Sequence, residues 1–146
     1  MNDLWPDDIT TNTILKAPVT ILKEQGVLLG RKTSNLVEGE VIKAFSDSED
    51  HFYYTFYLVG PALGYRYRLL VVSHSINMYP LDIIMDGKDV LGELPAEMKG
   101  EHNKLVADSE EKFMEILKAI FATRKVRRVI EAIIAQSGVE IEIETE

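Results

Sequence analysis

A histidine between two serines is the first place in this sequence where side chains could carry out chemistry. In the run "SHS", His74 could act as a general base for Ser73 or Ser75 as nucleophile. The run lies in a segment whose pattern predicts a β-strand, and neighbouring side chains of a strand point to opposite faces. His74 therefore cannot serve either adjacent serine, and a hydrolase would need a constellation assembled from distant parts of the chain.

The remaining residues with chemical potential form no metal or cofactor pattern. His51, His74 and His102 lack i, i+4 spacing and lie beside no cluster of carboxylates, and the chain contains no cysteine. The glycines near Gly87 and Gly92 match neither the phosphate-binding loop nor the dinucleotide fingerprint. The sequence thus indicates no cofactor and favours a non-enzymatic protein. An enzyme that uses His74 or His102 with a carboxylate stays open as a third hypothesis.

A basic cluster at the expected start of a helix is a candidate anion site. The run "TRKVRR" contributes Arg124, Lys125, Arg127 and Arg128. Positive charge in a first turn opposes the helix dipole, so local helix stability does not account for it. The N–H groups of that turn and these side chains could together hold a phosphate or an acidic partner. The alternative, which the acidic composition favours, is pairing within the chain. Its expected partners are Glu110, Glu111, Glu115 and the C-terminal run "EIEIETE".

The aromatic segment "HFYYTFYLVGPALGYRYRLLVV" predicts a β-hairpin with two different faces. The face expected to be buried carries Phe52, Tyr54, Phe56, Leu58, Tyr65, Tyr67, Leu69 and Val71. The opposite side of the second strand then carries Arg66, Arg68, Leu70 and Val72. Thr55 should share this open side, and together with the preceding strand the candidate partner-binding residues are Glu38, Glu40, Tyr53, Tyr57, Arg66 and Arg68. Tyr and Arg are enriched at interface hot spots, although a solvated sheet with Arg–Glu pairs would give the same pattern.

Hydrophobic periodicity predicts the elements that must position these residues. We expect helices over 18–32, 109–122 and 124–136, strands over 36–45, 52–60, 65–74 and 80–86, and a short fifth strand in "NKLVAD". Short connections favour antiparallel pairing, and the helices should cover one face of the sheet. The predicted fold class is α+β: a four- to five-stranded antiparallel meander with one N-terminal helix and two C-terminal helices.

The C-terminal third carries two apolar stripes, which should form much of the core. Expected buried residues are Phe113, Leu117, Ile120, Val129, Ile130 and Ile133. The two stripes are offset in phase, so we expect a break near Thr123. Asp108 with Glu111 resembles a capping box for the first helix, and Gly138 should end the second.

Composition limits the classes of function. With 146 residues and 46% hydrophobic content, a single domain is expected, with an arm over 1–16, the domain over 17–137, and an acidic tail or edge strand over 138–146. A net charge of −8 disfavours nucleic-acid binding. The polar N-terminus is unlike a secretory signal, and no apolar run is long enough to span a membrane, so a cytoplasmic protein is expected.

These observations predict an interaction protein that binds a protein partner, or a second copy of itself, through the Tyr/Arg-rich sheet face. The alternative is a domain that binds a small ligand, either a phosphate-bearing or an aromatic molecule.

Overall fold

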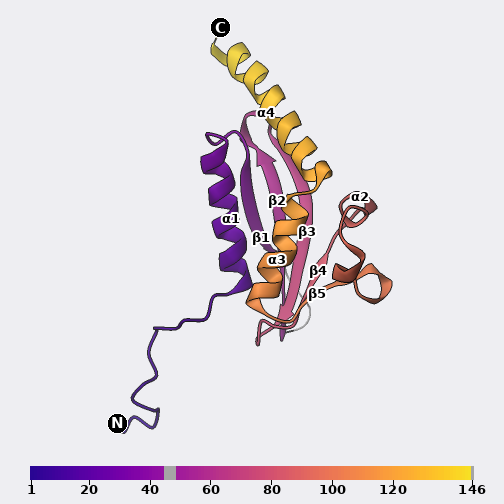
Figure 1. The fold of residues 1–146 in the computed structure, drawn as a ribbon. Coiled ribbons are helices and arrows are strands. Elements are labelled where there is room, and N and C mark those ends of the chain that lie inside the picture. The colour runs from indigo at the N-terminus through magenta and orange to yellow at the C-terminus, as the bar shows by residue number, and fades with distance from the viewer. Residues whose placement is uncertain (45–48, 146) are drawn as a thin grey trace.

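The computed structural model describes residues 1–44 and 49–145 and shows an α+β fold (Figure 1). Its long helices are α1 (Pro18–Lys32), α3 (Glu110–Phe121) and α4 (Arg124–Thr145). Its strands are β1 (Glu38–Ala44), β2 (His51–Gly60), β3 (Tyr65–Ser75), β4 (Leu81–Ile84) and β5 (Leu105–Ala107). Single turns are η1 (Pro61–Leu63), α2 (Lys88–Leu91), η2 (Ala96–Met98) and η3 (Glu101–Asn103). The predicted order of helix, meander and two helices is confirmed; residue 45 of the first predicted strand lies outside the described residues.

The five strands form one antiparallel sheet in the order β1-β2-β3-β4-β5. Figure 1 shows α1, α3 and α4 on the same face of this sheet. Helix α1 lies very close to β1, because a Cβ added at Gly26 would overlap the carbonyl oxygen of Gly39. Helix α4 crosses the β2–β3 end of the sheet, where a Cβ at Gly60 would lie 2.6 Å from Ile133. The helices thus leave the opposite face of the sheet uncovered.

The core lies between the sheet and the helices. From α3 it contains Phe113, Ile116, Leu117 and Ile120, and from α4 Val126 and Ile133. Val129 and Ile130 were predicted to be buried but are only partly so. The reason is the position of α4: it crosses the hairpin at the end of the sheet and continues beyond it (Figure 1), so the sheet covers less of its apolar stripe.

The helix boundaries differ from prediction at two of three points. The expected break is confirmed, since Thr123 separates α3 from α4 and donates from Oγ1 to the Ile120 carbonyl at 2.8 Å. Ser109, not Asp108, caps α3, because its Oγ accepts from the Lys112 N–H at 3.1 Å and it directly precedes the first helical residue. Gly138 does not end α4, which continues to Thr145 as a helix rather than a strand.

A β-bulge changes the predicted faces of β3. Adjacent residues Phe56 and Tyr57 of β2 pair with Leu70 and Arg68, which leaves Leu69 as an extra residue in β3. Arg66 and Arg68 therefore point away from the helices, as predicted. Beyond the bulge the alternation is inverted: Leu70 and Val72 join the core, while Val71, which was predicted on the covered face, takes the opposite face and is buried there at 8% exposed. The period-two pattern of the sequence cannot reveal an inserted residue.

Residues 1–16 contain no helix or strand and project from the start of α1 (Figure 1). Their large apolar side chains are exposed: Leu4, Trp5, Ile9, Ile14 and Leu15. Within the described part of the chain, no helix has both the length and the apolar character that crossing a membrane requires.

Candidate functional site

The sheet face opposite the helices, called here the open face, carries all six predicted partner-binding residues. Strand register arranges its side chains in rows across the sheet. One row is Glu38, Val59 and Arg66; the next is Glu40, Tyr57 and Arg68; the third is Ile42, Thr55, Val71 and Ile84; the fourth includes Tyr53, Ser73 and Asp82. The prediction that β1, β2 and β3 bring these side chains together on one surface agrees with the register.

The two arginines of the open face are already engaged within the chain. Arg66 pairs with Glu40, and its guanidinium lies 4.9 Å from the centre of the Tyr57 ring. Arg68 Nε lies 2.9 Å from Asp86 Oδ2. Exposed pairs of this kind contribute little to stability, but they fix the direction of the side chains and neutralise their charge. The open face therefore offers aromatic area with balanced charge, rather than a basic surface for phosphate.

An apolar row crosses the middle of this face and was missed by sequence analysis. Ile42, Thr55, Val71 and Ile84 are successive cross-strand partners on four strands. Ile84 is 46% exposed and Ile42 is partly exposed, whereas Thr55 and Val71, each 8% exposed, are buried between their neighbours. Ile42 could have been found, because it alternates with Glu40 on the same strand. Val71 could not, because the bulge inverts its side of the sheet.

Near the start of β2 and the end of β3, the open face holds a polar contact between residues that are distant in the sequence. His51 Nε2 lies 2.5 Å from Ser73 Oγ, and Asp82, the cross-strand partner of Ser73, pairs with Lys104 at 3.3 Å. Ser73 thus meets a histidine from β2 rather than its neighbour His74. Its side chain is buried, and its strand is paired on both sides, so its backbone N–H groups belong to the sheet and do not form an oxyanion hole. This geometry fits a buried polar pair better than a nucleophile.

His74 and His102 occupy very different environments. His74 is buried on the covered face between the rings of Phe52 and Tyr54, and its Nδ1 donates to the Ser75 carbonyl at 2.7 Å. His102 is exposed on η3. In the described residues no group of three His, Asp or Glu side chains is placed to hold a metal ion.

The predicted anion site at the start of α4 contains a carboxylate from the same chain. Glu93 accepts from the backbone N–H groups of Arg124 at 2.8 Å and Lys125 at 3.0 Å. These two hydrogen bonds lower the pKa of the Glu93 carboxyl below its usual value, and the Arg124 side chain adds to the effect. Lys125 also pairs with Asp89 at 3.5 Å. An external phosphate would have to displace Glu93 from the amides that it occupies.

The partners of the basic cluster are therefore not those expected. Arg127 lies 3.8 Å from Glu131, one turn further along α4. Sequence analysis expected Glu110, Glu111, Glu115 or the run "EIEIETE" as partners. The side chains of that run lie outside those described, and the observed acids come from the segment after β4 and from α4 itself. Glu93 is 31 residues from Arg124, so no local pattern could have identified it.

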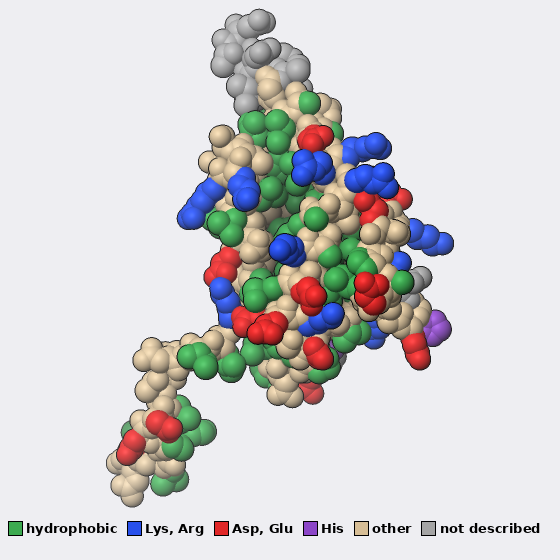
Figure 2. Space-filling view, in the orientation of Figure 1, with side chains coloured by type: hydrophobic (Ala, Val, Ile, Leu, Met, Phe, Trp, Pro, Cys, Tyr) green, Lys and Arg blue, Asp and Glu red, His purple; other side chains and the backbone are tan. Residues whose placement is uncertain are grey.

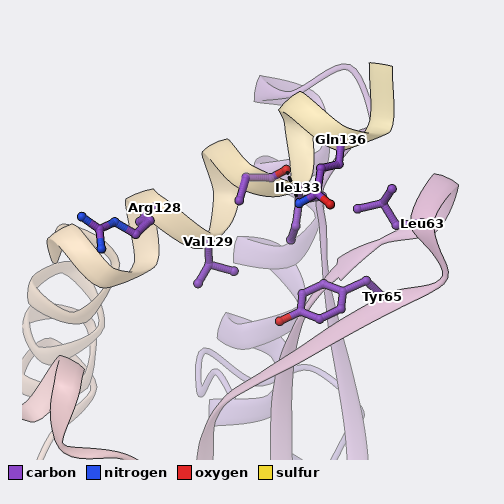
Figure 3. Close-up of a pocket in the computed structure, with 7 residues that line it drawn as sticks. Leu63, Tyr65, Arg128, Val129, Ile133 and Gln136 are labelled. Atoms are coloured by element: carbon purple, nitrogen blue, oxygen red, sulfur yellow. Dashed lines mark hydrogen bonds between the residues drawn. The ribbon is translucent and has the colours of Figure 1, made fainter. Parts of the chain in front are cut away.

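Arg128 belongs to a separate feature, a groove between α4 and the end of the β2–β3 hairpin (Figure 3). This tip groove has a volume of about 520 Å³ and is lined by Leu63, Tyr65, Arg128, Val129, Ala132, Ile133 and Gln136. Figure 3 shows Val129 and Ile133 projecting from α4 toward the hairpin residue Tyr65, while Arg128 precedes them on the helix and its guanidinium extends away from Tyr65, at the edge of the groove. The tip groove combines an apolar lining with one positive side chain.

Comparison with known proteins gives no match for this chain. No family model, no curated protein sequence and no solved structure is significantly similar to it. Its function is therefore argued from the geometry of these surfaces.

Proposed function

We propose that this protein binds a protein partner through the open face. The observation that supports this proposal is the apolar row of Ile42, Thr55, Val71 and Ile84 on a sheet face that no long helix covers. Contiguous apolar surface with a polar border is typical of protein contact sites. Tyr57 extends this row on one side, next to Glu40 and Arg68.

The charge arrangement favours a protein surface over an anionic ligand. Arg66 and Arg68 are neutralised by Glu40 and Asp86, so they offer hydrogen bonds without a large excess of positive charge. Such paired groups suit the rim of an interface, where they select the orientation of a partner more than they add affinity. The exposed members at and beside the row, Ile84, Ile42 and Tyr57, then supply most of the binding free energy, because their burial removes apolar area from water.

Site-specific photo-crosslinking tests this proposal first. A photoreactive phenylalanine analogue replaces Tyr57 on the open face, and in a second variant it replaces Ile76, an exposed residue of the β3–β4 turn. We expect position 57 to crosslink a defined protein in the native cell and position 76 to give no such product. Equal products from both positions would contradict the proposal.

A matched pair of charge insertions then measures the contact with the crosslinked protein. Ile84→Arg places a charge in the apolar row, while Ile76→Arg makes the same change off the open face at a residue that is 70% exposed. We expect Ile84→Arg to weaken the complex about 30-fold or more, as the loss of an interface anchor does. Ile76→Arg should have the affinity of the parent protein. If both variants keep the parent affinity while folding normally, the open face is not the contact site.

A further inference from the structure

The N-terminal arm, residues 1–16, has the composition of a docking segment. Leu4 and Trp5 are 92% and 75% exposed, and Ile9 is also exposed. Asp3, Asp7 and Asp8 lie among these apolar residues, and no Lys or Arg precedes Lys16. Figure 2 shows hydrophobic and acidic side chains together on this arm, away from the body of the protein. Such exposed apolar area is unfavourable in water unless another surface covers it.

The tip groove has the complementary chemistry. Leu63, Tyr65, Val129 and Ile133 supply apolar surface, and Arg128 supplies positive charge. No carboxylate with a described side chain lies within ion-pair distance of Arg128. The volume of the tip groove, about 520 Å³, is in the range of sites that hold one large side chain or a small molecule.

We propose that Trp5 and its acidic neighbours dock in the tip groove of a second copy of this chain, and that the exchange is reciprocal. Trp5 would fill the apolar lining, while Asp7 or Asp8 would pair with Arg128. Because each copy has one arm and one groove, mutual exchange closes a two-fold dimer. The surface involved lies on the helical side of the sheet, so this inference does not depend on binding at the open face.

The geometry of the arm favours exchange over docking in the same chain. The arm leaves α1 at its N-terminal end and points away from the body, whereas the tip groove lies at the opposite end of the molecule (Figure 1). Residues 5–17 span about 40–47 Å when fully extended, which exceeds the length of α1 at about 22 Å, so the direction of the arm rather than its length favours exchange. Docking within one chain would require the arm to reverse at Lys16, where the side chain pairs with Glu24 of α1 at 2.6 Å.

The position of the single tryptophan gives a direct test on the intact protein. The chain has one Trp, and it lies in the arm, so intrinsic tryptophan fluorescence reports on the arm alone. We expect sedimentation velocity to show a dimer, and the Trp5 emission to shift to the blue over the same concentration range. A monomer with solvent-exposed emission at all concentrations overturns the proposal. A blue-shifted monomer also overturns it, because that result means docking within one chain.

Three variants assign the contact to its residues. Trp5→Ala removes the docking side chain, and Ala132→Phe fills the groove at an exposed helix position. Each should raise the dimer dissociation constant about 30-fold or more, with no change in circular dichroism. Arg128→Glu should also weaken the dimer, while Lys23→Glu, the control with the same type of charge reversal on α1, should not. Dimers unaffected by the first two variants would exclude the tip groove.

A mixing experiment and a charge exchange provide the decisive readouts. Trp5→Ala and Ala132→Phe chains, each impaired alone, should form a heterodimer when mixed, because the first retains its groove and the second retains its arm. Combining Arg128→Glu with Asp7→Lys and Asp8→Lys should recover at least part of the affinity lost by Arg128→Glu alone. Failure of both experiments would reject reciprocal exchange, whatever is found for the open face.

Discussion

The two faces of the sheet differ in what their side chains contact. On β2, Phe56 is 1% exposed under the helices, while its neighbour Tyr57 is partly exposed on the open face beside Arg66. The covered face is held by apolar packing and close glycine contacts, whereas the open face combines an apolar row with charge pairs. Since alternate residues of one strand serve each face, stability and the proposed partner binding should be separable by mutation along a single strand.

The largest expected effect comes from truncating the adjacent β2 residues Phe56 and Tyr57, each in a separate variant. Phe56→Ala removes a fully buried ring and should lower the free energy of unfolding by about 3–5 kcal/mol. Tyr57→Ala should lower it by about 1 kcal/mol or less, because its ring is not part of the core. Urea denaturation measures both. Equal losses would mean that the open face contributes to the fold as much as the covered face does.

Glycine substitutions sharpen the comparison at the contact between α1 and β1. A Cβ at Gly26 overlaps backbone atoms of Gly39, so Gly26→Ala must displace the helix and should cost about 1–3 kcal/mol or more. Gly138→Ala is the matched control, since no atom lies within 4 Å of its added Cβ and α4 is helical there. That control should stabilise the protein by about 0.5–1 kcal/mol. A destabilised Gly138→Ala would argue against helix continuing through this residue.

A smaller, pH-dependent effect is expected where Glu93 binds the start of α4. Its pKa is lower in the folded protein, so its stabilising contribution is present above the unfolded pKa of about 4.5 and is lost as the pH falls. Thermal denaturation between pH 3 and 7 should therefore show a weaker acid destabilisation for Glu93→Gln than for the parent protein. Glu97→Gln, at an exposed position on η2, should leave the pH profile unchanged.

The smallest expected effect concerns Tyr79 at alkaline pH. Burial, with a contribution from nearby Glu110, raises the pKa of its phenol from 10.0 to about 12, so the fold favours the neutral form. Its contribution is complete below about pH 10 and is lost as the pH rises toward 12. Tyr79→Phe should reduce the alkaline loss of stability, measured by denaturation between pH 8 and 11.5. Tyr57→Phe on the open face should retain the parent profile.

The periodicity of apolar residues was sufficient to predict the helices and strands, because a helix or strand that is buried on one side carries apolar residues at a regular spacing. The α1 boundaries and the break at Thr123 followed from apolar spacing and from a change in phase. The cap of α3 and the end of α4 did not, since Ser109 and Asp108 are both good caps and a glycine can lie inside a helix.

The sites were harder to predict because their partners are distant in sequence. The open-face residues of β1 and β2 were found from alternation, but Val71 was assigned to the covered face because the bulge at Leu69 leaves no local signal. Glu93 reaches the start of α4 across a long segment, and His51 reaches Ser73 from the adjacent strand. Contacts of this kind depend on the register and the path of the chain.

Because Leu69 is an extra residue in β3, the number of residues in this strand decides which side of the sheet each side chain takes. A substitution in this strand changes one side chain and leaves the others on their own sides of the sheet. Deletion of Leu69 itself would remove the bulge and leave Arg66, Arg68, Leu70 and Val72 on their present sides, whereas a residue inserted elsewhere in β3 would turn one end of the strand over. Among descendants of this gene, we therefore expect β3 to accept substitutions, and the loss of Leu69, more readily than insertions between Tyr65 and Val72.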